Sequence, residues 1–150
     1  MTTVLLMGCN SINENQKDTI NVKEEDKEII TEYLNNKTGN QIVPSGVECY
    51  SAFEILGTSS DNIYLWVLKE NISGCGGSMP VSLNVKKDKD NLDIISYKIP
   101  GDGDDYGKDI DKLFPKNVRK KIKCGGGEHN FRVNRLQKQI DEIKMVGNKN

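Results

Sequence analysis

The sequence predicts an α+β fold, in which one helix precedes an antiparallel sheet of about four strands and helices follow it. Three observations carry this prediction. Apolar residues have helical spacing near the N-terminus, alternate with polar residues between residues 47 and 99, and return to helical spacing after residue 100. The 150 residues are enough for one domain with a hydrophobic core.

The first helix is predicted over residues 23–36. Asn21 is placed to cap it, and the acidic residues of its first turn suit the positive end of the helix dipole. The apolar stripe of this helix consists of Ile29, Ile30, Tyr33 and Leu34.

Four predicted strands follow. The first covers residues 47–55, where apolar and polar residues alternate. The second, residues 63–68, is apolar at every position, which is typical of a central strand covered on both faces. The third and fourth cover residues 81–86 and 92–99, and residues 74–78 are predicted to form a loop.

Residues 100–115 combine several acidic residues with glycines, a composition found in calcium-binding loops. Asp102 and Asp104 fit the first and third positions of an EF-hand loop, and Gly107 fits the sixth. Leu113 occupies the twelfth position, where a bidentate glutamate is needed. We therefore predict no metal site here.

The same segment is predicted to form a turn and then a helix. The helix begins near Tyr106, with Asp104 or Asp105 as its cap. Pro115 ends this helix or opens the next, and Val118 and Ile122 continue the apolar pattern. Residues 23–123 form the predicted α+β domain.

Residues 124–150 are predicted to be a glycine-rich link and a C-terminal amphipathic helix. The helix is too short for a coiled coil, and the alternative is that it docks on the sheet. Its apolar positions are Val133, Leu136, Ile140 and Ile143.

The N-terminus carries a short motif. Leu6, Gly8 and Cys9 resemble the lipobox of bacterial lipoproteins, so residues 1–8 are interpreted as a partial signal peptide. The resemblance implies a diacylglyceryl group on Cys9, and two acyl chains suffice for stable anchoring. Residues 9–22 are polar and lack aromatic residues, which predicts a flexible tether.

A second resemblance covers residues 46–122. A strand centred on Trp66 precedes a segment with the pattern P-x-D-G-x-x-Y…D-I-x-K-x-F-P. In these features the chain resembles a family of small uncharacterised extracytoplasmic proteins of low-GC Gram-positive bacteria. The resemblance implies an extracytoplasmic location and no particular activity. The matching positions are Pro100, Asp102, Gly103, Tyr106, Asp109, Ile110, Lys112, Phe114 and Pro115.

The predicted order of elements is similar to that of the cystatins, or of the cone-shaped fold of the nuclear transport factors. Residues 41–46 also resemble the Gln-x-Val-x-Gly loop of cystatin protease inhibitors, although the spacing is one residue too long.

Tyr64, Trp66 and Tyr106 are the candidate binding residues. Core packing is the default role of Tyr64 and Trp66, because they lie on the predicted central strand. The alternative is a ligand pocket between the first helix and the sheet, near Trp66.

Cysteine chemistry is less favoured. Cys49, Cys75 and Cys124 allow one disulfide, whose pairing the sequence leaves open, and without a CxxC pair no zinc site is predicted. Cys75 or Cys124 could pair with His129 as nucleophile and base, but no third group is evident to orient the base. No catalytic residue is therefore assigned, and no cofactor is expected.

The formal net charge of −1 argues against general binding to nucleic acid. A basic cluster within residues 116–123 is interpreted as a solvated helix face, with contact to anionic lipids or wall polymers as the alternative.

The sequence as a whole predicts a non-enzymatic protein, lipid-anchored through Cys9 on the extracytoplasmic face of the cell membrane. Such a protein would bind another protein or an envelope component. The alternatives are a small-ligand-binding module and, less favoured, a cysteine-dependent enzyme.

Overall fold

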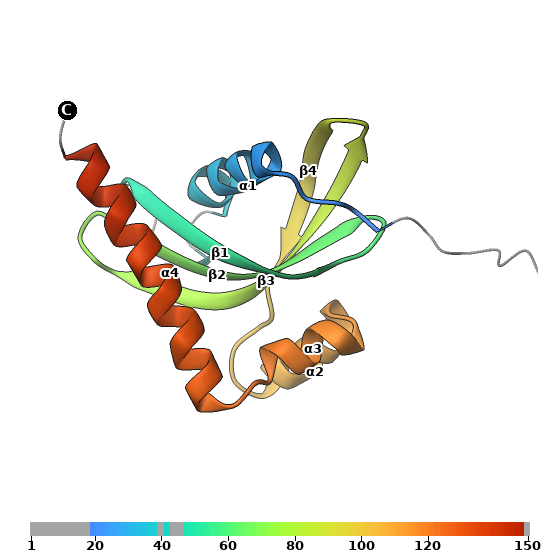
Figure 1. Ribbon diagram of the computed structural model, residues 1–150. Coiled ribbons are helices and arrows are strands. Elements are labelled where there is room, and N and C mark those ends of the chain that lie inside the picture. Colours follow the sequence, from blue (N-terminus) through green and yellow to red (C-terminus); the bar gives the residue numbers. More distant parts are fainter. Residues whose placement is uncertain (1–18, 39–40, 43–46, 149–150) are drawn as a thin grey trace, which may run out of the picture.

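The computed structural model describes residues 19–38, 41–42 and 47–148. A four-stranded antiparallel sheet lies between helix α1 on one face and helices α2, α3 and α4 on the other (Figure 1). The predicted α+β fold is confirmed, while the cystatin-like and nuclear-transport-factor-like arrangements stay predictions. The elements are α1 (Glu24–Lys37), β1 (Cys49–Thr58), β2 (Asn62–Asn71), β3 (Gly76–Asp88), β4 (Asn91–Lys98), α2 (Asp104–Leu113), α3 (Lys116–Ile122) and α4 (Gly126–Gly147).

The sheet is a meander with the strand order β1-β2-β3-β4, so β1 and β4 are its edges. Strand β2 is buried on both faces, as its apolar run predicts. Its side chains alternate: Ile63 and Leu65 pack on the α1 side, and Tyr64 and Trp66 pack on the side of α2 to α4. Two hydrophobic cores therefore share one strand.

Strand β3 begins earlier than the pattern predicts. Residues 76–78, predicted as part of a loop, pair with β2, and Gly77 lies opposite Lys69. A Cβ atom on Gly77 would lie 2.6 Å from the backbone oxygen of Ile42. Glycine permits this close approach, so a residue that signals a loop in sequence here serves a strand.

The N-terminal end of α1 is held by Asp26 and not by the predicted cap Asn21. Lys23 is the N-cap residue, and its backbone N–H donates to the Asp26 carboxylate at 2.7 Å. Asp26 is buried and forms an ion pair with Lys87 of β3. Burial opposes ionisation, but the hydrogen bonds from Lys87 and the Lys23 backbone outweigh it and hold the pKa of Asp26 below its ordinary value.

The acidic turn before α2 differs from the prediction in one detail. The helix begins at Asp104, and its N-cap is Gly103 with φ of 62° and no side-chain cap bond. The predicted capping by Asp104 or Asp105 is therefore wrong. Both lie in the first turn, where their charge suits the helix dipole. Within the described ranges, no group of three or more potential ligands could hold a metal ion.

Helix α4 docks on the sheet. Leu136 and Ile140 are buried in the core that contains Trp66, whereas Ile143 is 43% exposed. Docking, one of the two predicted alternatives, is confirmed. No helix of the described part is both long and apolar enough to cross a bilayer.

Cys9, the partial signal peptide and residues 9–18 of the predicted tether lie outside the described residues, as do residues 43–46 of the cystatin-like loop. The end of the predicted tether is packed. Ile20 is buried on the α1 side, and its backbone N–H donates to the Ser59 carbonyl at 3.0 Å. The folded domain thus begins before α1.

Candidate functional site

The predicted aromatic residues lie in the core between the sheet and the C-terminal helices. Trp66 Nε1–H donates to Ser78 Oγ at 2.6 Å, and the Tyr64 ring lies 5.8 Å from that of Phe114. Both point away from α1, so they cannot line the expected pocket between α1 and the sheet. Tyr106 lies on α2, outside this core, with 39% of its surface exposed.

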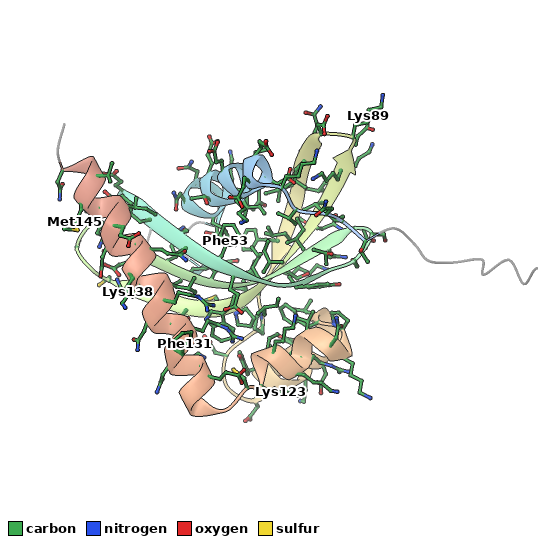
Figure 2. All side chains as sticks on the ribbon, in the orientation of Figure 1. Phe53, Lys89, Lys123, Phe131, Lys138 and Met145 are labelled. Carbon is green, nitrogen blue, oxygen red and sulfur yellow. The ribbon has the colours of Figure 1, made fainter. Side chains whose placement is uncertain are left out.

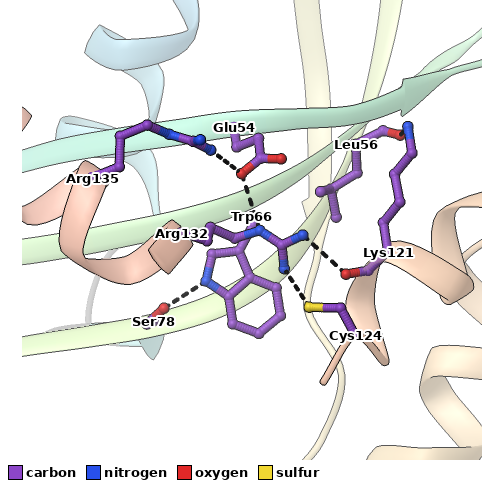
Figure 3. A network of polar contacts seen from close by, with 8 residues as sticks. All are labelled: Glu54, Leu56, Trp66, Ser78, Lys121, Cys124, Arg132 and Arg135. Atoms are coloured by element: carbon purple, nitrogen blue, oxygen red, sulfur yellow. Dashed lines mark hydrogen bonds and ion pairs between the residues drawn. The ribbon is translucent and has the colours of Figure 1, made fainter. Parts of the chain in front are cut away.

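A buried arginine organises the polar contacts around Trp66 (Figure 3). Arg132 of α4 donates from Nε to Glu54 Oε2 at 3.0 Å and from Nη2 to the Lys121 carbonyl at 3.0 Å. Its guanidinium lies 5.4 Å from the centre of the Trp66 ring. Arg135 donates to the same Glu54 oxygen at 2.5 Å. The network ties α4 to β1 and to the end of α3.

The structure does not join the cysteines and the histidine into a catalytic pair. Cys124 Sγ accepts a hydrogen bond from Arg132 at 3.6 Å, while the His129 ring packs edge-on against Trp66. No hydrogen bond connects Cys124 with His129 in the described part of the chain. Cys75 is exposed on the β2–β3 turn, and Cys49, Cys75 and Cys124 are all free thiols.

The predicted basic cluster is largely occupied by contacts within the protein. Arg119 and Lys123 both pair with Asp111 at 3.2 Å. Lys121 donates to the Leu56 carbonyl at 2.7 Å. These contacts favour the interpretation as a helix face and leave less charge for an anionic partner.

Sequence reasoning missed a buried amine on the α1 side. Lys69 is 1% exposed, and its Nζ donates to Thr38 Oγ1 at 2.9 Å. Among the described residues no carboxylate pairs with it, and burial lowers its pKa. The sequence did contain a signal that Lys69 is buried. Ile63, Leu65 and Val67 point to the α1 side of β2, and alternation along the strand places the side chain of residue 69 on the same side.

Sequence reasoning also missed a groove along the outer edge of β1. Two cavities, of about 640 and 440 Å³, follow this strand and share Lys27 and Thr31 of α1. We call them together the edge groove. Helix α1 forms one wall, and Gln139 and Ile143 of α4 contribute to the other. Its lining residues are Glu24, Lys27, Glu28, Thr31, Glu32, Asn35, Asn36, Val47, Glu48, Cys49, Ser51, Ala52, Phe53, Ile55, Gln139 and Ile143.

The two ends of the edge groove differ in chemistry. The end beside residues 47–49 carries four glutamates against one lysine, Lys27, which is itself paired with Glu24 at 2.5 Å. The end beside residues 51–55 has no carboxylate among its lining residues, and half of those residues are apolar, including Phe53, which lies on the α1 side of β1 (Figure 2). The groove is therefore acidic at one end, and more apolar and free of carboxylates at the other.

Two buried polar atoms in the edge groove lack hydrogen-bond partners among the described residues. They are Ser51 Oγ and Asn35 Oδ1. Ser51 is 2% exposed, so water has little access to its hydroxyl group. A buried polar group without a partner costs free energy, so these two atoms lower the stability of the fold beside the groove.

The polar groups of the two regions contrast. Around Trp66 they satisfy one another and hold α4 in place, whereas beside the edge groove two buried polar atoms lack hydrogen-bond partners among the described residues. Comparison with protein-family models, with curated protein sequences and with solved structures finds no match to this chain.

Proposed function

We propose that this protein is a non-enzymatic extracytoplasmic protein, anchored by lipid on Cys9, that binds another protein along the edge groove. The observation that carries the binding role is the edge groove itself, a strand edge between two helical walls that none of the described residues pairs with. The lipobox-like residues Leu6, Gly8 and Cys9 support the anchor.

A protein partner suits the shape of the groove better than a small ligand does. Small ligands favour concave pockets that enclose most of their surface. Here the space between α1 and the sheet is filled by the apolar core, and the cavities lie outside it along a strand. An elongated groove at a sheet edge fits an extended chain.

The anchor is tested by intact mass and detergent partitioning of the protein expressed in a Gram-positive host from the longest upstream start codon. We expect a chain that begins at Cys9, carries a diacylglyceryl group and enters the detergent phase. The Cys9→Ser variant should stay in the aqueous phase. A wild-type chain that keeps Met1 and stays aqueous contradicts the anchor.

The binding role is tested by photo-crosslinking in intact cells. A photoreactive residue replaces Glu28, which lines the edge groove, or Lys120, which is exposed on α3. We expect a discrete crosslinked product of defined mass from position 28 and none from position 120. Equal products from both positions, or none from either, contradict binding in the groove.

A further inference from the structure

We propose that the occupant of the edge groove is an extended polypeptide segment that pairs with β1 as an additional antiparallel strand. The segment is apolar in its N-terminal half and carries lysine or arginine in its C-terminal half. This inference rests on the proposed function, since it specifies the partner of the same groove.

The first argument is the free edge of β1. Strand β1 pairs with β2 on one side only. No backbone hydrogen bond to the other side of residues 49–58 occurs in the described part of the structure. Such an edge offers unpaired N–H and C=O groups to another strand. Because every pair in this sheet is antiparallel, an antiparallel guest continues its pattern.

The second argument is that β1 is better prepared for a guest than β4. On the α1 side, the cavity beside β4 has a volume of about 230 Å³, against about 640 and 440 Å³ along β1. A cavity of about 540 Å³ that also touches β4 spans three strands and α2, so it lies over the face of the sheet and not along its edge. Strand β4 also exposes the charged side chains of Asp93 and Lys98, and charged side chains on an edge strand discourage pairing. No residue of β1 is fully exposed.

The β-bulge of β1 limits where the guest pairs. The register between β1 and β2 shifts between Ile55 and Gly57. A bulge interrupts regular pairing and bends the strand. The regular stretch is residues 49–55, and the cavities that adjoin β1 also end at Ile55. The guest therefore spans about seven paired residues.

The direction of the guest follows from the two ends of the groove. In an antiparallel pair, the C-terminal half of the guest lies beside the start of β1. That end carries Glu24, Glu28, Glu32 and Glu48, which attract cationic side chains. The N-terminal half lies beside Phe53 and the other apolar lining residues, so apolar side chains fit there. A parallel guest would need the opposite order.

The test uses two capped synthetic peptides and the full chain. One peptide is Val-Thr-Val-Ser-Lys-Thr-Lys, and the other has the same residues in reverse order. We expect the first to bind at least about tenfold more tightly in calorimetric titration. In ¹⁵N NMR spectra it should perturb the amides of residues 49–55 and leave those of β4 unchanged. Equal affinity of the two peptides overturns the proposed direction.

Backbone methylation of the peptide tests the pairing itself without altering the protein. Methylation of alternate peptide nitrogens that face β1 should abolish binding, whereas methylation of the other alternate set should leave it intact. If both sets bind equally, side chains alone hold the peptide and strand pairing is wrong. Equal binding by an oligolysine of the same charge makes the groove a general polycation site and also overturns the proposal.

Two protein variants locate the charge effect. Glu28→Gln combined with Glu32→Gln should weaken the first peptide about threefold to tenfold, whereas Glu128→Gln, exposed in the first turn of α4, should change nothing. If crosslinking from position 28 succeeds while the peptide fails to bind, strand pairing is overturned and the binding role survives. If crosslinking from position 28 fails, the proposed function itself is contradicted.

Discussion

Replacing Arg132 with alanine should lower the free energy of unfolding by about 3 kcal/mol, whereas replacing Arg135 should lower it by less than about 1 kcal/mol. Both guanidinium groups bind the same oxygen of Glu54, and the contact of Arg135 is the shorter, at 2.5 Å against 3.0 Å. Burial separates them, because the Arg132 side chain is 7% exposed and that of Arg135 is 45% exposed.

The magnitude follows from what each truncation leaves behind. Without Arg132, the Lys121 carbonyl loses its donor and Trp66 loses the cation that lies over its ring. Breaking a buried ion pair costs about 3–5 kcal/mol, and the lower end applies because Glu54 keeps Arg135. Without Arg135, Glu54 keeps its buried partner and only an exposed pair is lost.

Urea unfolding followed by far-UV circular dichroism measures both losses. Dichroism is preferable to fluorescence because Arg132 contacts the only tryptophan, so its removal alters the emission directly. The slope of free energy against urea should stay constant, which shows that the same surface is exposed on unfolding. An Arg135→Ala variant that loses as much stability as Arg132→Ala would refute the reasoning from burial.

Three further predictions concern stability. Because the folded-state pKa of Asp26 is depressed, its ion pair stabilises the fold above the ordinary aspartate pKa of about 4, and that contribution is lost as pH falls through the folded value. The stability advantage of the wild type over Asp26→Asn should therefore shrink between about pH 6 and about pH 3 in urea titrations. For Lys69 the lowered pKa means that the folded state binds its proton less tightly, so the wild type gains stability as pH rises toward about 10. Lys69→Met should be at least as stable as the wild type at neutral pH and should lack this gain in stability at alkaline pH. A variant that keeps the gain shows that Lys69 is not its source. Gly77→Ala should cost about 1–3 kcal/mol through its clash with a backbone oxygen, whereas Gly107→Ala, which meets nothing within 4 Å, should stabilise α2 by about 0.5–1 kcal/mol. Thermal unfolding of the two glycine variants gives opposite shifts in Tm if the contacts are as described.

Much of the fold can be predicted from the local spacing of apolar residues. The unbroken apolar run of residues 63–68 indicates a strand covered on both faces, and β2 has that burial. The spacing of Leu136 and Ile140 likewise indicates a helix with one buried face. What the pattern could not reveal is which face of the sheet each element covers, because that depends on how the chain crosses the sheet edge.

The edge groove could not be predicted from the sequence for a similar reason. The edge groove joins α1, β1 and α4, which are far apart in sequence, and Ser51 looks like an ordinary strand residue until its missing partner is seen. Gly77 was misleading because glycine signals a loop locally, while here a tertiary contact with Ile42 requires it. The first strand of a meander does lie at an edge, so an open strand at this position was the one signal available.

The contact between α4 and β1 also has a consequence for the time course of folding. The strands pair only with their sequence neighbours, but the Arg132–Glu54 bond joins residues 78 positions apart. Short-range hairpins form faster than contacts that close long loops. The meander should therefore assemble first, and α4 should dock only after its residues have left the ribosome. Until then the part of the Trp66 face that Leu136 and Ile140 cover is exposed, so a chain that stops before α4 should self-associate during synthesis.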